Sequence, residues 1–104
     1  MRRGEVWWAQ LEGPAGRRPV LLLTRNAAYA IRTSVTIAPI TTTIRDIPVE
    51  VRLTSREGLR REGAVNLDEI QTIRMERLIR EMTTLSPDTM EKVDQAIRFA
   101  LAIG

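Results

Sequence analysis

Short apolar segments separated by turn residues occupy most of the first 75 positions of this chain and limit the folds that it can adopt. Glu5–Leu11 is rich in aromatic and aliphatic residues, Pro19–Thr24 is an almost continuous apolar run, and Val35–Ile40 is β-branched. Such segments are typical of strands, and the continuous run is typical of a strand that is covered on both faces. Gly13–Gly16, which reads Gly-Pro-Ala-Gly, has the composition of a turn. The pattern therefore predicts a sheet of short strands.

The middle of the chain continues this pattern with shorter segments. In Pro48–Leu53 the apolar residues alternate with Glu50 and Arg52, which predicts a half-exposed strand. Two further strands are expected at Ala64–Leu67 and Ile70–Ile73. Met75–Met82 is compatible with a short helix or with an extended connection. The segments between the strands are polar: Arg25–Thr33, Thr41–Asp46 and the charged Arg56–Gly63.

The last segment predicts a helix. Ser86-Pro87-Asp88 places an N-cap serine before a proline at the first helical position and an acid in the first turn. The apolar residues that follow share one face at helical spacing: Met90, Val93, Ile97, Ala100 and Leu101. We expect this face to pack on the sheet and to support a dimer.

With 104 residues the chain has room for one domain, residues 1–104, around one modest core. Two tryptophans, one tyrosine and one phenylalanine are its aromatic residues, so aliphatic side chains must supply most of the burial. A core of this size favours stabilisation by oligomerisation. Many short strands followed by one terminal helix predict an α+β fold, a small SH3-like β-barrel with a C-terminal helix.

The chain contains no cysteine and no histidine. Disulfides, thiolate metal sites, histidine metal sites and serine–histidine triads are therefore excluded. Any catalysis must come from arginine, carboxylates, hydroxyls, a tyrosine or the single lysine, Lys92. We expect no metal and no cofactor.

The formal net charge of +3 is unevenly distributed, with the surplus of arginine in residues 1–65. A coding bias towards arginine is one explanation, and phosphate recognition by a planar, permanently charged group is the other. No apolar run approaches the roughly 20 residues that span a bilayer. Met1-Arg2-Arg3-Gly4 enters a strand directly, without the apolar region of a signal peptide. The sequence predicts a cytoplasmic protein with no membrane partner.

Polar groups lie at the ends of two apolar strands. Arg17 and Arg18 come directly before Pro19–Thr24, and Thr41-Thr42-Thr43 follows Val35–Ile40. Arg18 precedes a proline, which keeps its backbone extended. A guanidinium and a hydroxyl brought together in this way suit a phosphate oxygen better than they suit a protein core.

These segments resemble the MazF/PemK family of toxin ribonucleases, over nearly the whole chain. The residues that carry the resemblance are Arg3-Gly4-Glu5-Val6-Trp7, Arg18-Pro19-Val20, Ala38-Pro39-Ile40-Thr41 and Val65–Ile73. The resemblance implies a PemK-like barrel and a catalytic pair formed by Arg18 and Thr41. Asp68 is a weaker third candidate, because Asn66 stands where some members of the family have an arginine, and Gln71 is a further departure.

The resemblance also implies the activity and the partners. The substrate would be single-stranded RNA, cut without a metal by attack of a ribose 2′-hydroxyl to leave a 2′,3′-cyclic phosphate and a 5′-hydroxyl end. The toxin would be a homodimer that inhibits growth and is neutralised by a MazE-like antitoxin with a disordered acidic C-terminal segment. The substrate-binding candidates are Trp7 (with Trp8 as the alternative stacking ring), Arg17, Arg25, Asn26, Thr42, Thr43 and Arg45.

Two other functions are compatible with a small barrel of this kind. A gyrase poison of the CcdB type shares the barrel, but that group relies on a C-terminal Trp-Gly-Ile, whereas this chain ends in Leu101-Ala102-Ile103-Gly104. A non-catalytic SH3-like binding module would usually present several aromatic side chains in a groove, and this chain has few.

Overall fold

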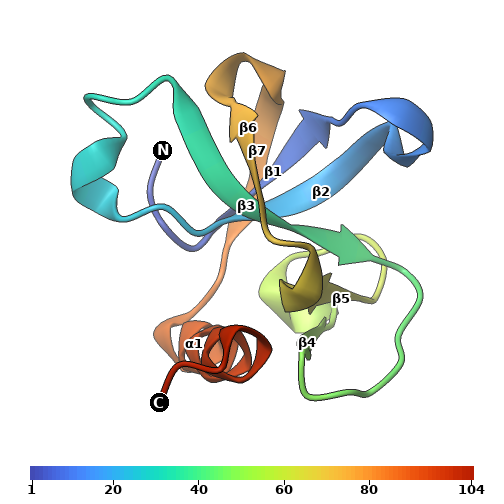
Figure 1. The fold of residues 1–104 in the computed structure, drawn as a ribbon. Helices are drawn as coiled ribbons and strands as arrows, with labels where there is room; N and C mark the ends of the chain where they lie inside the picture. The colour runs from blue at the N-terminus through green and yellow to red at the C-terminus, as the bar shows by residue number, and fades with distance from the viewer.

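The computed structural model describes all of residues 1–104 and contains seven strands, five short 3₁₀ turns and one α-helix (Figure 1). The predicted α+β class and the C-terminal helix are confirmed. The elements are β1 (Glu5–Gln10), β2 (Arg17–Leu22), β3 (Ser34–Thr41), β4 (Glu50–Leu53), β5 (Gly63–Asn66), β6 (Gln71–Arg74), β7 (Leu78–Thr84) and α1 (Pro87–Leu101).

The strands form one antiparallel sheet in the order β4-β5-β3-β2-β1-β7, with β6 also paired to β3. Strand β3 is central, because its first half pairs with β6 and its end pairs with β5, while β2 occupies its other edge. The outer strands β4 and β7 do not pair with each other. The small barrel-like sheet that the sequence predicts is therefore not closed between these two strands.

The predicted strands lie close to the observed ones, with one ambiguity resolved. Met75–Met82 contains a short 3₁₀ turn, Met75–Arg77, followed by strand β7, so the extended alternative is right and the helical one is wrong. Strand β7 is held by pairing with β1, where Trp8 lies opposite Arg80. That partner is far away in the sequence, which is why local pattern alone left this segment undecided.

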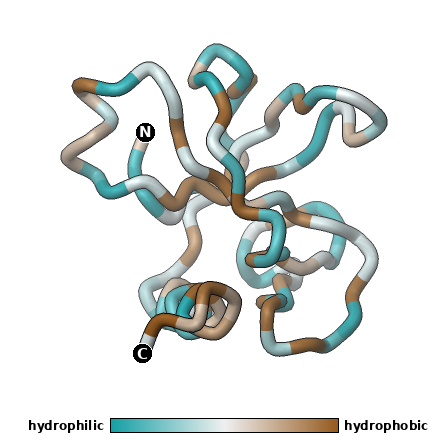
Figure 2. Tube along the Cα trace, viewed as in Figure 1, coloured by the Kyte–Doolittle hydropathy of each residue, from teal (hydrophilic) through white to brown (hydrophobic).

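The sheet has apolar side chains on both faces, and they form two core clusters. Leu21 belongs to the larger cluster, which lies between the sheet and α1, whereas Val20 and Leu22 belong to the smaller cluster on the other face. All three side chains are fully buried, as expected for a strand covered on both sides. Figure 2 shows the hydrophobic segments gathered where the strands cross at the centre of the molecule.

Helix α1 begins as its sequence predicts and then covers one end of the sheet. The Ser86 hydroxyl accepts a hydrogen bond from the Thr89 backbone N–H at 3.2 Å, with Pro87 in the first turn. Val93 and Ala96 are buried against β4 and the Leu67–Glu69 turn. Leu101 is 55% exposed, so its expected packing on the sheet is wrong, although its neighbour Ala100 packs against the larger cluster. Neither α1 nor any other helix has the length and apolar character to cross a membrane.

Candidate active site

A pocket of about 590 Å³ opens where β3 passes from pairing with β2 to pairing with β5. Its walls come from β1, the start of β2, the end of β3, the loop before β5, and β7. Arg18 and Thr41, the two residues predicted to be catalytic, both line it. Arg17, Thr42 and Thr43 line it as well. The structure thus brings together five of the residues that the sequence singled out.

Strand register explains why Arg18 and Thr41 line the same pocket. The pairing of β2 with β3 sets Leu22 opposite Ile37 and Val20 opposite Pro39. Continuing that antiparallel register by two residues leads to Arg18 on one strand and Thr41 on the other, at the point where the pairing has ended. Arg18 pairs with Ala9 of β1 on its other side, so its backbone stays in the sheet. The two side chains are therefore positioned by a rigid scaffold.

The hydroxyl of Thr41 is oriented by its own chain. Its Oγ1 accepts a hydrogen bond from the Thr43 backbone N–H at 3.1 Å. A hydroxyl that accepts in this way keeps its own proton free to donate. Thr42 and Thr43 are exposed beside it. This geometry leaves a hydroxyl donor at the edge of the pocket, suited to an anionic oxygen.

The charge of the pocket is strongly positive. Four arginines line it, and none of the four takes part in any of the ion pairs of the chain: Arg17, Arg18, Arg60 and Arg61. The single acid in the lining, Glu62, is bound by Arg52 with an N–O distance of 2.7 Å. Clefts lined by one sign of charge concentrate ions of the other sign. The site is therefore built to receive an anion.

Of the two tryptophans, Trp8 lines the pocket and Trp7 does not. The indole N–H of Trp7 donates to the Glu5 carboxylate at 2.9 Å, and its ring packs against the smaller core cluster. Adjacent residues in β1 point to opposite faces, as predicted. The substrate-binding candidate Trp7 thus lies away from the site, and its neighbour Trp8 takes the place expected for it.

Four other predicted site residues are not brought to the pocket. Asn26 Oδ1 accepts a hydrogen bond from the Arg3 backbone N–H at 2.6 Å, and Arg25 precedes it in the same exposed loop. Arg45 forms an ion pair with Glu50 at 3.2 Å. Asn26 and Arg45 are thus engaged in contacts outside the pocket.

Asp68 is the fourth of these residues, and its position follows from a turn. The buried Asn66 side chain accepts a hydrogen bond from the Asp68 backbone N–H at 3.0 Å, at the start of the Leu67–Glu69 turn. Asp68 itself is exposed. Asn66 and Asp68 therefore stabilise the turn between β5 and β6.

Sequence reasoning treated Arg60 and Arg61 as part of a charged loop and did not place Met82 near the site. All three line the pocket. The one signal for the arginines was a repeated arrangement, because Arg60-Arg61 precedes a short apolar strand just as Arg17-Arg18 does. Met82 carried no such signal, since its place depends on the pairing of β7 with β1.

Comparisons with known proteins show the family to which the chain belongs. Residues 2–101 match the family model of the PemK-like, MazF-like toxin of type II toxin-antitoxin system. The probable endoribonuclease MazF5 of Mycobacterium tuberculosis is 36% identical over 100 residues, which cover 95% of this chain and 91% of that protein. Endoribonuclease EndoA of Bacillus subtilis is 31% identical over 111 residues, covering 99% of this chain and 96% of EndoA.

Two solved structures have nearly the same fold. The Mycobacterium tuberculosis toxin MazF-mt6 superposes with a TM-score of 0.89 at 35% identity, covering 96% of this chain and 98% of that one. An endoribonuclease in complex with its cognate antitoxin from Mycobacterial species also gives a TM-score of 0.89, at 30% identity and with 100% and 97% coverage. Because the family model matches residues 2–101 of its 104 residues, this chain belongs to the PemK-like, MazF-like toxins of type II toxin–antitoxin systems.

Proposed function

We propose that this chain is a toxin endoribonuclease that cuts single-stranded RNA without a cofactor. The observation that carries the proposal is that four arginines without ion-pair partners line the same pocket as Thr41, whose hydroxyl keeps its proton free to donate. A polyanion with a reactive phosphate matches these groups. The close relatives MazF5 and EndoA carry the name endoribonuclease, which favours this function over a gyrase poison or a non-catalytic SH3-like module.

The chemistry follows from the groups present. The nucleophile is the ribose 2′-hydroxyl of the substrate, whose oxygen bonds to the adjacent phosphorus as the bond from phosphorus to the 5′ oxygen breaks. The 2′-hydroxyl proton passes to water, and the departing oxygen takes a proton from water. The products are a 2′,3′-cyclic phosphate and a 5′-hydroxyl end. The protein contributes alignment and charge stabilisation, which are large terms in catalysis.

Arg18 is suited to stabilise the negative charge that grows on the phosphoryl oxygens. A guanidinium stays protonated, so it acts by charge-assisted hydrogen bonds rather than as a base. The Thr41 hydroxyl, with its proton free, donates to a second oxygen of the same phosphate and holds it in line. These two groups form the proposed catalytic pair.

Other residues that line the pocket are suited to bind the RNA. Trp8 offers an aromatic surface on which an unstacked base can lie. Arg17 supplies a further guanidinium to the backbone, and Thr42 and Thr43 supply exposed hydroxyls. We place these four residues in substrate binding and leave out Trp7, which packs against the smaller core cluster.

The proposed partners are an antitoxin and a second copy of the chain. An acidic, disordered antitoxin segment would cover the pocket by matching its unpaired arginines with carboxylates. A solved relative in complex with its cognate antitoxin supports this kind of partner. The dimer is supported by apolar side chains exposed at the end of α1 and beyond it: Phe99 (62%), Leu101 (55%) and Ile103 (55%). We place the protein in the cytoplasm.

One experiment tests the activity directly. The purified protein is incubated with a long single-stranded RNA in excess EDTA, and the ends of the fragments are mapped. We expect discrete cuts with 5′-hydroxyl ends, absent with Arg18→Ala and retained with Arg56→Ala, an exposed arginine outside the pocket. Intact RNA with the unaltered protein, or cuts that persist with Arg18→Ala, would contradict the proposal.

A further inference from the structure

The loop between β4 and β5, residues 54–62, places two arginines in the lining of the pocket, and the proposed cleavage chemistry assigns neither of them a role. Arg60 and Arg61 are exposed, line the pocket beside Thr41, and form no ion pair. Leu59, directly before them, is buried in the larger core cluster and anchors the loop to the core. Two long cationic side chains thus stand on a segment that is itself attached to the core.

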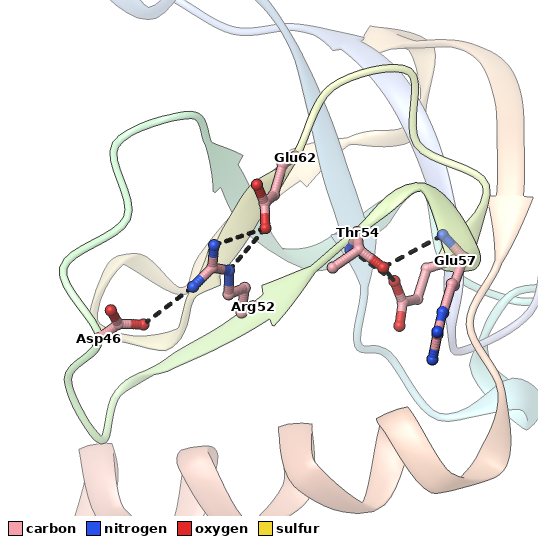
Figure 3. Close-up of polar contacts among 6 residues, drawn as sticks. Asp46, Arg52, Thr54, Glu57 and Glu62 are labelled. Atoms are coloured by element: carbon pink, nitrogen blue, oxygen red, sulfur yellow. Dashed lines mark hydrogen bonds and ion pairs between the residues drawn. The ribbon is translucent and has the colours of Figure 1, made fainter.

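The start of this loop is held by a capping box (Figure 3). The Glu57 carboxylate accepts from the Thr54 backbone N–H at 2.6 Å and from the Thr54 hydroxyl at 2.9 Å. The Thr54 backbone N–H is the main reason that the pKa of Glu57 lies below its ordinary value. Gly58 ends the turn with a φ of +88°, a conformation that glycine adopts without strain.

The end of the loop is held by an ion pair. Arg52 on β4 donates to the Glu62 carboxylate from Nε at 2.8 Å and from its terminal nitrogen at 2.7 Å, a two-pronged contact (Figure 3). The same guanidinium lies 3.9 Å from Asp46 (Figure 3). Because both prongs reach one carboxylate, the negative charge of Glu62 is offset by a residue outside the pocket. The arginines of the pocket therefore keep their charge unbalanced.

Strand order decides where the two pairs of arginines lie relative to Thr41. The sheet runs β5-β3-β2, so β3, which ends at Thr41, lies between the strand that follows Arg60-Arg61 and the strand that begins with Arg17-Arg18. All four arginines line the same pocket. An anion that spans the pocket across Thr41 meets guanidinium groups on both sides.

From this arrangement we infer that Arg60 and Arg61 form a phosphate-binding arm that grips the RNA on the β5 side of the cut, while Arg17 and Arg18 grip it on the β2 side. The inference rests on the proposed function and deepens it, because it makes the substrate a strand with phosphates on both sides of Thr41. The Arg52–Glu62 ion pair and the Thr54–Glu57 capping box are positioning elements of the arm. Backbone contacts of this kind hold a strand in register without reading its bases.

The arm has a measurable electrostatic signature. Each phosphate neutralised on a single strand adds about 0.7 to the slope of log Kd against log salt concentration. The double variant Arg60→Ala/Arg61→Ala should lower that slope by about 0.7 or more. In cleavage it should raise KM with little change in kcat, since the groups at the reacting phosphate remain in place.

The test measures binding to a single-stranded RNA of mixed sequence in which every ribose carries a 2′-O-methyl group, so that attack by the 2′-oxygen is blocked. Fluorescence anisotropy gives Kd at several salt concentrations for the unaltered protein, the double variant and Arg56→Ala. We expect the double variant to bind at least 10-fold more weakly at low salt with a reduced slope, and Arg56→Ala to match the unaltered protein. Arg56 is the matched control, because it lies in the same loop, exposed, and outside the pocket.

The outcomes separate the arm from the catalytic proposal. A double variant with the Kd and slope of Arg56→Ala overturns the arm, even if RNA cleavage is confirmed. Arm-dependent binding by a protein that cuts no RNA supports the arm and rejects the ribonuclease. A protein that binds polyglutamate through the arm but no RNA overturns the inference in favour of an acidic protein ligand.

A second variant tests the support of the arm. Arg52→Gln removes the partner of Glu62 and leaves a free carboxylate among the pocket arginines. We expect weaker binding of the 2′-O-methyl RNA, by about the same factor as the double variant, and recovery when Glu62→Gln is added to Arg52→Gln. Unchanged binding by Arg52→Gln would show that the ion pair has no part in the arm.

Discussion

Gly63 lies against the end of β3 so closely that a Cβ on it would be 2.7 Å from the backbone oxygen of Thr41. The strand pairing is responsible, because Thr41 lies opposite Ala64 in the register of β3 with β5. The absence of a side chain at Gly63 thus lets the loop that carries Arg60 and Arg61 end next to the Thr41 backbone. This close approach brings the loop with Arg60 and Arg61 to the same pocket as Thr41.

The variant Gly63→Ala should therefore damage both stability and activity. The added methyl must displace backbone, and overpacking of this kind costs about 1–3 kcal/mol in the free energy of unfolding. Thermal denaturation and RNA cleavage measure the two effects. Gly104→Ala is the control, since a Cβ at Gly104 meets nothing within 4 Å. A Gly63→Ala protein with unchanged melting and cleavage would show that β5 can move away from Thr41 at no cost.

Replacement of Thr41 separates its hydroxyl from its shape. Thr41→Val keeps the branched side chain and loses the donor, which should reduce kcat by about 100-fold or more. Thr41→Ser should retain most of the activity, because the oxygen that accepts from the Thr43 backbone N–H is still present. Single-turnover cleavage measures this, with the exposed Thr33→Val as the control. Equal rates for the valine and serine variants would exclude a role for the hydroxyl.

Two substitutions on α1 test the observed packing of the helix. Val93 is fully buried in the larger core cluster, and Leu101 is 55% exposed. Val93→Asp should prevent stable folding, because it buries an unpaired charge. Leu101→Asp should change the unfolding free energy of the single chain by no more than about 0.5 kcal/mol, as exposed positions do. Urea denaturation compares them, and a large loss with Leu101→Asp at every protein concentration would contradict the exposed position.

Stability at alkaline pH should depend on Tyr29. Burial is the main reason that the pKa of this phenol rises from its ordinary value of 10.0 to about 12, and the negative charge of Glu5 adds to it. Its hydroxyl is buried without a hydrogen-bond partner. Because the folded state holds the proton more tightly, this stabilisation is complete below pH 10 and is lost as the pH rises towards 12.

Tyr29 is the single tyrosine of the chain, so the ultraviolet absorbance of tyrosinate reports it alone. The native protein should titrate near pH 12 and the urea-unfolded protein near pH 10. Tyr29→Phe should show a smaller loss of Tm between those values than the unaltered protein. Coincident titrations of the native and unfolded protein would show that the phenol is open to solvent.

Much of the site was predictable because it depends on residues next to each other. Arg18-Pro19 before a buried strand and Thr41 after another are local arrangements, and both residues line the pocket as expected. The Ser86 cap of α1 is equally local and is confirmed. Arg60 and Arg61 were not predicted to share this pocket, because a charged loop has no feature that says which element it lies beside.

By itself the sequence determined the elements and their chemistry: short strands, one capped helix, an arginine and a hydroxyl at strand ends, and no histidine or cysteine. These properties follow from backbone preferences and side-chain types that act over a few residues. Only the tertiary structure decided that Trp8 rather than Trp7 lines the pocket, that Asp68 and Leu101 lie elsewhere, and that the sheet stays open. The place of Trp8 and the open sheet depend on which distant strands pair and in what register, and a register is set by the packing of the whole chain. The exposed positions of Asp68 and Leu101 depend on which sides of a turn and of α1 the rest of the chain covers.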